Sequence, residues 1–261
     1  MVIDTHAHFL PGLDDGSKDR AMTEAMLRLA AARGTSAIFA TPHVVEAGKL
    51  PLWEAIVEQV DQWQAWCKEQ QLGLRLAPGA EVYLNWDLLE VIGQEGPSGR
   101  AYCYGGGNYV LVELPVAVLP SYTEEFFYRL ALKGLQPVLA HVERYPMFFE
   151  RRRELYKFKE KGYLFQLNGN SLRGFYGKRV EAQARALLKE QAIDLLGSDG
   201  HRAEGRDTDL AFVEEALMAL DPEYRDRLLF KNGQALLAGQ PIEATRPVVS
   251  AGAWWRRLFH S

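Results

Sequence analysis

The feature that most constrains the fold of this sequence is a regular alternation of short apolar runs with amphipathic stretches. The runs are residues 2–3, 37–40, 74–76, 109–112, 137–140, 163–167 and 193–196. Between them, apolar residues recur every three or four positions, for example in 22–29, 180–188 and 210–220, as on one face of a helix. Glycines stand where such helices should end in left-handed caps, at Gly34, Gly73, Gly134 and Gly162. We therefore expect an α/β fold with helices outside a parallel sheet.

Seven strand and helix units favour a closed TIM-like barrel over an open doubly wound sheet. No interior linker rich in proline, glycine or serine interrupts the pattern, so we expect one domain over residues 1–240. Residues 241–261 differ in composition and form a basic, aromatic C-terminal tail. From Arg246 onward the tail has three arginines, no acidic residue and the pair Trp254 and Trp255.

Composition excludes several classes of protein. The chain has 261 residues, 48% of them hydrophobic, which argues against disorder. Its 30 basic and 34 acidic residues give a net charge of -4, so no overall basic surface is available for nucleic acid. Two cysteines cannot form a disulfide framework, no apolar run approaches the roughly eighteen residues of a membrane span, and the N-terminus lacks a signal-peptide pattern. We expect a cytoplasmic protein.

Five of the six histidines lie within a residue or two of the end of a predicted strand: His6, His8, His43, His141 and His201. Carboxylates occupy equivalent positions at Glu81, Glu113 and Asp199. The carboxyl ends of parallel barrel strands meet at one mouth, so these side chains should crowd together. Because buried carboxylates must be paired, protonated or coordinated, and histidine and carboxylate together suit metal ions, two or three divalent ions are expected.

Taken singly, each of these residues has a simpler interpretation. A histidine at the end of one strand is more often a hydrogen-bonded structural residue than a ligand. The sequence Asp14-Asp15-Gly16 looks like a turn, in which Asp15 or Ser17 could cap the next helix. The joint placement favours the metal site, because separate structural histidines have no reason to choose the same end of successive strands.

Several motifs together resemble a known family. They are Asp4-Thr5-His6-Ala7-His8, the following Leu-Pro-Gly-Leu-Asp-Asp-Gly, Ala40-Thr41-Pro42-His43, Gly79-Ala80-Glu81, His141-Val142-Glu143-Arg144-Tyr145 and Ser198-Asp199-Gly200-His201. In this order, over residues 1 to about 240, they resemble the polymerase and histidinol phosphatase (PHP) superfamily. Within it they are similar to the bacterial tyrosine-protein phosphatases of capsule and exopolysaccharide loci. The resemblance implies a distorted (β/α)7 barrel, up to three divalent ions and hydrolysis of phosphotyrosine on a partner tyrosine kinase.

The resemblance also implies a role for each site residue. His6, His8, Glu81 and Asp199 would hold one ion. Glu81 would bridge to a second ion, completed by Glu113 and His141, while Asp15, His43 and His201 would hold the third. Arg144 and Arg206 match the arginines that hold the phosphate. Manganese is the metal we expect first, and iron or zinc would suit the same mixture of ligands.

Such a centre can activate a water molecule for attack on phosphorus without a covalent enzyme intermediate. A phenol leaving group, with a pKa of about 10, needs little protonation, and Asp14 or His201 is the candidate acid. The rival cysteine-based mechanism needs an arginine six residues after the nucleophile. The residues six after Cys67 and Cys103 are Gly73 and Tyr109, so that mechanism is not expected.

Each of two basic segments has two possible interpretations. Between Arg144 and Lys161 there are seven basic and three acidic residues. They could form a solvated helix face, or attract an anionic peptide to the mouth. The tail from Arg246 to Ser261 could contact a membrane surface or a second subunit, or could be an ordinary packed or frayed end.

The expected function is therefore a metal-dependent protein-tyrosine phosphatase that acts on a kinase controlling polysaccharide export. One alternative keeps the fold and metals but takes a small phosphate ester such as histidinol phosphate as substrate. Another is a non-catalytic metal-binding scaffold that holds the kinase or a membrane partner. The sequence predicts no nucleic-acid partner and leaves the oligomeric state open.

Overall fold

The computed structural model describes residues 1–46, 51–149 and 151–248. The strands are β1 (Val2–Ala7), β2 (Thr35–Ala40), β3 (His43–Val44), β4 (Arg75–Pro78), β5 (Glu81–Tyr83), β6 (Glu95–Gly96), β7 (Gly99–Arg100), β8 (Tyr109–Glu113), β9 (Gln136–Leu139), β10 (Leu164–Asn168) and β11 (Leu195–Gly197). The α-helices are α1 (Arg20–Ala32), α2 (Trp53–Glu69), α3 (Thr123–Leu132), α4 (Arg152–Glu160), α5 (Lys178–Lys189), α6 (Ala211–Ala216), α7 (Pro222–Asp226) and α8 (Asn232–Leu237).

The strands form a distorted seven-membered barrel. A three-stranded sheet, β1-β2-β4, and a six-stranded sheet, β11-β10-β9-β8-β5-β3, are both parallel. They are joined because β2 leads into β3 after residues 41–42, and β4 into β5 after residues 79–80. The remaining edges meet at a parallel bridge between Ala7 and Gly200. All seven predicted strands are present, and the predicted fold is confirmed.

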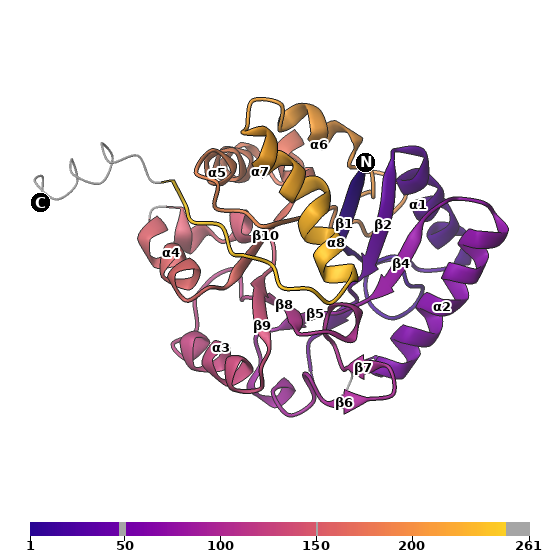
Figure 1. Cartoon of the computed structure of the whole chain (residues 1–261), viewed down its shortest axis with the longest axis horizontal. Helices are drawn as coiled ribbons and strands as arrows, with labels where there is room; N and C mark the ends of the chain where they lie inside the picture. Colours follow the sequence, from indigo (N-terminus) through magenta and orange to yellow (C-terminus); the bar gives the residue numbers. More distant parts are fainter. Residues whose placement is uncertain (47–50, 150, 249–261) are drawn as a thin grey trace, which may run out of the picture.

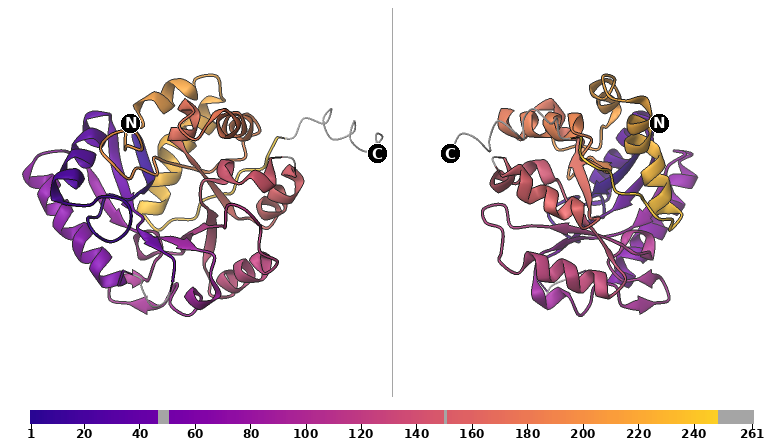
Figure 2. Two further views of the ribbon diagram at one scale, coloured as in Figure 1. Left: turned by 180° about the vertical axis from the view of Figure 1, so that it is seen from behind. Right: turned by 60° about the vertical axis from the view of Figure 1, so that its left-hand side comes forward.

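The helices lie around the outside of the sheet, as Figures 1 and 2 show. Helices α1 and α5 cover the two predicted periodic segments 22–29 and 180–188, whereas α6 ends at Ala216, before the end of the third. The four predicted glycine caps all have positive φ, between 65° and 85°. A small antiparallel hairpin, β6-β7, was not predicted, because its strands are only two residues long.

The barrel interior changes from apolar to polar along each strand. On β8, Tyr109, Leu111 and Glu113 alternate onto one face, and the first two belong to an apolar cluster with Ile3 and Leu195. Glu113 therefore stands at the carboxyl end of the strand, above this packed layer. The apolar layer fills the lower part of the barrel and leaves the charged residues at the mouth.

Residues 241–248, which sequence analysis assigns to the tail, run across the opposite end of the barrel. The backbone N–H of Ile242 donates to the Tyr109 hydroxyl at 2.6 Å, and that of Thr245 donates to Oδ1 of Asp194 at 2.7 Å. Figure 1 shows this segment crossing the strands after α8. The remainder of the tail, with Trp254 and Trp255, lies outside the described residues. Within the described ranges, no helix is long and apolar enough to cross a membrane.

Candidate metal centre

The two histidines that follow the first strand share one side of an extended segment. Successive side chains of a strand alternate in direction, so residues two apart point the same way. His6 and His8 are both buried, and their Nε2 atoms lie 3.0 Å apart. They form the floor of the mouth.

Two carboxylates complete a compact group around these nitrogens. Oε2 of Glu81 lies 3.2 Å from Nε2 of His6 and 3.4 Å from Nε2 of His8. Oδ1 of Asp199 lies 3.5 and 3.4 Å from the same two nitrogens. Four ligands about 2.1 Å from one ion, arranged as a tetrahedron, would be roughly 3.4 Å apart. The four atoms are thus spaced as metal ligands are.

The two inward-facing carboxylate oxygens accept no hydrogen bond from the described part of the chain. Both Oε2 of Glu81 and Oδ1 of Asp199 are fully buried, as is the similarly unpartnered Nε2 of His201. Burying an unpaired carboxylate oxygen costs desolvation free energy, and a bound cation offsets this cost. The residues therefore fit a metal ion, and the fit rests on both spacing and unsatisfied atoms.

Glu81 also faces a second group. Its Oε1 lies 2.8 Å from Nε2 of His141, which is 3.5 Å from Oε1 of Glu113. Nδ1 of His43 lies 3.1 Å from Oε2 of Glu81 and 3.9 Å from Oε2 of Glu113. The two oxygens of Glu81 thus face different partners, as a bridging ligand requires.

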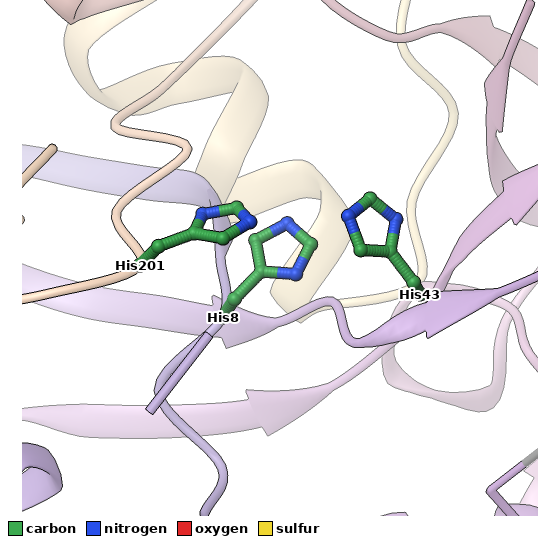
Figure 3. Close-up of side chains that lie close together, drawn as sticks. All are labelled: His8, His43 and His201. Atoms are coloured by element: carbon green, nitrogen blue, oxygen red, sulfur yellow. The ribbon is translucent and has the colours of Figure 1, made fainter. Parts of the chain in front are cut away.

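A third group lies nearer to solvent. Oδ1 of Asp15 is 3.5 Å from Nε2 of His43 and 3.3 Å from Nε2 of His201. The ring of His8 lies between the two histidines, 4.5 Å from that of His43 and 4.0 Å from that of His201, as Figure 3 shows. Asp15 is 69% exposed, so this group forms the open side of the cluster. All nine predicted ligands are brought to one mouth.

Hydrogen bonds at Nδ1 orient three of the imidazoles. Nδ1 of His8 donates to Oδ2 of Asp14 at 2.6 Å, and Nδ1 of His201 to the carbonyl of Asp199 at 2.9 Å. Nδ1 of His6 faces Oε1 of Gln166 at 3.3 Å. A proton on Nδ1 leaves the lone pair of Nε2 free, which is the arrangement found around metal-bound histidines.

Electrostatics keep both central carboxylates ionised. Burial raises the pKa of Glu81, but the charges of His6 and His43 outweigh burial and hold that pKa well below its usual range. Burial likewise raises the pKa of Asp199, and His6, His8 and Arg206 together lower it further than burial raises it. The mouth therefore presents two fixed negative charges to a cation.

Two of the predicted ligands have unusual backbone conformations. His141 has φ 31° and Asp199 has φ 54°, although neither is glycine. Left-handed backbone at such residues costs free energy and is concentrated at functional sites. The turns at the ends of β9 and β11 hold these two side chains over the barrel.

The two predicted phosphate-binding arginines lie beside the cluster. Nη1 of Arg144 is 3.1 Å from Oδ2 of Asp199, and Nη2 of Arg206 is 2.5 Å from the same oxygen. Both side chains are about one-quarter exposed. Arg173, by contrast, pairs with Asp207 at 2.8 Å. Asp199 thus faces the candidate metal group with one oxygen and the arginines with the other.

Three polar residues of the site were not predicted from the sequence. Oδ2 of Asp199 also accepts from Nδ2 of Asn168 at 2.7 Å and from the hydroxyl of Tyr176 at 3.2 Å. Gln166, on the same strand as Asn168, accepts from the backbone N–H of His141 at 2.7 Å. Gln166 and Asn168 could have been found from the sequence, because they are polar residues at alternate positions of an otherwise apolar strand. Tyr176 lies in a loop, and no sequence pattern marks it as a site residue.

The basic stretch after β9 is divided between structure and surface. Arg152 pairs with Glu190 at 2.6 Å, and the buried Lys159 pairs with Asp194. Arg151 and Arg153 are exposed. Part of this stretch is therefore committed to holding α4 against its neighbours.

Both cysteines are free and buried. Burial raises the pKa of Cys67 to about 11 and that of Cys103 to about 12, so both thiols stay protonated near neutral pH. Neither lies in the mouth described above. This agrees with the sequence-based expectation that they are not nucleophiles.

Known proteins are similar to this chain in sequence and fold. Residues 2–238 match the family described as "Capsular polysaccharide synthesis, CpsB/CapC". Tyrosine-protein phosphatase YwqE of Bacillus subtilis is 32% identical over 244 residues, covering 92% of this chain and 93% of its own. Tyrosine-protein phosphatase CpsB of Streptococcus pneumoniae is 26% identical over 210 residues, covering 78% of this chain and 85% of its own.

A solved structure agrees with the sequence matches. A chain from the crystal structures of YwqE and CpsB, described there as unique metal-dependent tyrosine phosphatases, superposes with a TM-score of 0.84. It is 30% identical and covers 94% of this chain and 98% of its own length. The family model, the sequence relatives and the fold agree over nearly the whole chain. The resemblance found from the sequence motifs is confirmed: the chain belongs to the CpsB/CapC family of capsular polysaccharide synthesis proteins.

Proposed function

We propose that this chain is a metal-dependent phosphatase that hydrolyses phosphotyrosine in a protein substrate. One observation carries the proposal. Asp199 directs a buried, unpartnered Oδ1 toward His6 and His8, while its Oδ2 accepts from Arg144 and Arg206. A cation-binding group and an anion-binding group thus share one residue, as a site for a metal-assisted phosphate ester reaction requires.

The residues divide into three ligand groups. His6, His8, Glu81 and Asp199 would hold one ion, and Glu81, Glu113 and His141 a second. Asp15, His43 and His201 would hold a third, on the side open to solvent. Bound divalent ions would supply an activated water molecule and neutralise charge on the phosphate oxygens. We expect two or three ions, manganese first and iron or zinc as alternatives.

Arg144 and Arg206 are placed to receive the phosphate. In the structure, both guanidinium groups donate to the same oxygen of Asp199. Arginine forms charge-assisted, often paired hydrogen bonds with phosphate, so an incoming phosphate would compete with Asp199 for these donors. The arginines would hold the phosphate oxygens while the ester bond breaks.

Asp14 is better placed to orient His8 than to protonate the leaving group. Its carboxylate accepts from Nδ1 of His8, from the backbone N–H of His43 at 3.0 Å and from that of Gly16 at 2.9 Å. These three donors occupy it. A phenolate leaves with little help because the pKa of a phenol is about 10. His201, which burial and the neighbouring His8 keep neutral by lowering its pKa to about 2, is no better an acid.

The substrate we propose is a tyrosine-phosphorylated kinase linked to capsule or exopolysaccharide synthesis. YwqE and CpsB, named as tyrosine-protein phosphatases, and the family description as capsular polysaccharide synthesis support this choice. We further propose a cytoplasmic location and no nucleic-acid partner, in line with the net charge of -4.

The deciding experiment ranks substrates on the manganese-loaded protein. The specificity constant is measured for a phosphotyrosine peptide, for the same peptide with phosphoserine, and for histidinol phosphate. We expect the phosphotyrosine peptide to be the best substrate. A tenfold preference for histidinol phosphate would replace the proposal by the small-ester alternative. Metal binding without hydrolysis of any of the three would favour a non-catalytic scaffold.

A further inference from the structure

Tyr176 contacts both the carboxylate and one of the guanidiniums of the proposed site. Its hydroxyl donates to Oδ2 of Asp199 at 3.2 Å. The guanidinium carbon of Arg144 lies over its ring, 4.6 Å from the ring centroid, within the range of a cation–π contact. Tyr176 is therefore in contact with a candidate metal ligand and a candidate phosphate ligand together.

A short loop with two glycines presents this side chain. Gly174 and Gly177, on either side of Phe175 and Tyr176, have φ of 75° and 91°. The loop joins the 3-10 turn Gly169–Arg173 to α5. Positive φ at both glycines turns the chain before and after the tyrosine, a conformation that other residues adopt only with strain. The loop thus directs the tyrosine back toward the mouth.

Oδ2 of Asp199 is shared by four donors. Arg144, Arg206, Asn168 and Tyr176 all point at it, whereas one carboxylate oxygen offers about two lone-pair sites. If phosphate draws both arginines away, Asn168 and Tyr176 remain as neutral donors. Asp199 would then keep its orientation toward His6 and His8 while substrate is bound.

We propose that Tyr176 is a positioning residue with two separable tasks. Its hydroxyl holds Asp199 with Oδ1 directed toward the candidate metal group, and its ring supports the Arg144 guanidinium where it meets the phosphate. The proposal rests on the proposed function for the phosphate task. The metal task follows from the contact with Asp199 alone.

Two substitutions separate the tasks. Tyr176→Phe removes the hydroxyl and keeps the ring, and Tyr176→Leu removes both. Tyr128→Phe is the matched control, because Tyr128 is 54% exposed on α3 and is not one of the site residues. Manganese affinity is measured by competition with a coloured chelator, and kcat and KM are measured with p-nitrophenyl phosphate at saturating manganese.

Tyr176→Phe should weaken manganese binding about tenfold, because residues that hydrogen-bond to metal ligands commonly contribute a factor of about ten to a hundred to metal affinity. Its KM should stay within about twofold of the unchanged protein. Tyr176→Leu should show the same metal defect and raise KM a further three- to tenfold, as expected for loss of a cation–π contact. Tyr128→Phe should change neither quantity.

Each task can fail separately. Unchanged manganese affinity in Tyr176→Phe would overturn the role of the hydroxyl. Equal KM values in Tyr176→Phe and Tyr176→Leu would overturn the role of the ring. If Tyr176→Leu does not fold, Tyr176→Phe still tests the hydroxyl. Tyr176→Trp then tests the ring, because tryptophan retains an aromatic face, and its KM should stay near that of Tyr176→Phe. A KM raised more than tenfold in Tyr176→Trp would contradict the ring's role. Failure of the proposed function would instead appear as absent phosphotyrosine hydrolysis in the unchanged protein, with the metal-affinity result intact.

Discussion

Oδ2 of Asp14 accepts a hydrogen bond from Nδ1 of His8 at 2.6 Å, so Nε2 is the nitrogen that His8 presents to Glu81 and Asp199. Burial lowers the pKa of His8, but the surrounding carboxylates of Asp14, Asp199 and Glu81 outweigh burial and raise that pKa well above its ordinary value. Asp14 therefore fixes the orientation of one proposed ligand.

We predict that Asp14→Asn lowers manganese affinity about ten- to hundredfold, because an amide orients the imidazole less strongly than a carboxylate does. At saturating manganese most of the activity should return. Metal titration followed by turnover measures both effects. Normal metal affinity combined with a loss of kcat that grows for poorer leaving groups would instead identify Asp14 as the general acid.

Glu81 should be the most sensitive of the proposed ligands, because its two oxygens face different groups. Glu81→Gln keeps the size of the side chain and removes its charge. We expect bound metal and turnover to fall together, as measured by elemental analysis and phosphotyrosine peptide hydrolysis on the same preparation. A fully metallated and fully active variant would contradict the bridging role.

Arg144 should act on the phosphate, and at saturating manganese its removal should leave the metal content unchanged. A hydrogen bond to a charged group contributes roughly 1.5–3 kcal/mol, so Arg144→Ala should reduce kcat/KM about ten- to hundredfold. Arg173→Ala is the matched control, because Arg173 pairs with Asp207 and not with Asp199. Loss of metal or of the fold in Arg144→Ala would assign that arginine a structural role.

The exposed arginines before and at the start of α4 should attract anionic peptides. We predict that Arg151→Gln with Arg153→Gln reduces kcat/KM for an acidic phosphotyrosine peptide at low salt and leaves p-nitrophenyl phosphate hydrolysis nearly unchanged. The peptide effect should disappear as salt rises. Arg152 is left in place because its pairing with Glu190 holds α4 to α5. A salt-independent effect would argue against electrostatic attraction.

The histidines and carboxylates of the mouth were predictable because parallel strands of a barrel end at one face. His43 and His141, nearly a hundred residues apart, could be placed together on that basis alone. The fold class followed from the alternation of strands and helices, and the family from the motifs at the strand ends. Both are confirmed by the sheet topology and the relatives. The division of ligands among ions came from the family resemblance.

Other features depend on tertiary packing that periodicity does not encode. A polar residue on a buried strand, such as Asn168, is more often a hydrogen-bonded core residue than part of a site. Tyr176 reaches Asp199 only through a loop conformation set by two glycines. Residues 241–248 carry no periodic pattern, and their contacts with Tyr109 and Asp194 depend on the completed barrel.

Metal dependence is tested most directly by measuring turnover of a phosphotyrosine peptide by protein stripped of metal and then titrated with manganese. We predict no turnover in the stripped protein and recovery that saturates at two or three bound ions. The double variant Cys67→Ser with Cys103→Ser should follow the same curve within a few fold, because both thiols are buried away from the mouth. Full turnover by the metal-free protein would contradict a metal-dependent mechanism.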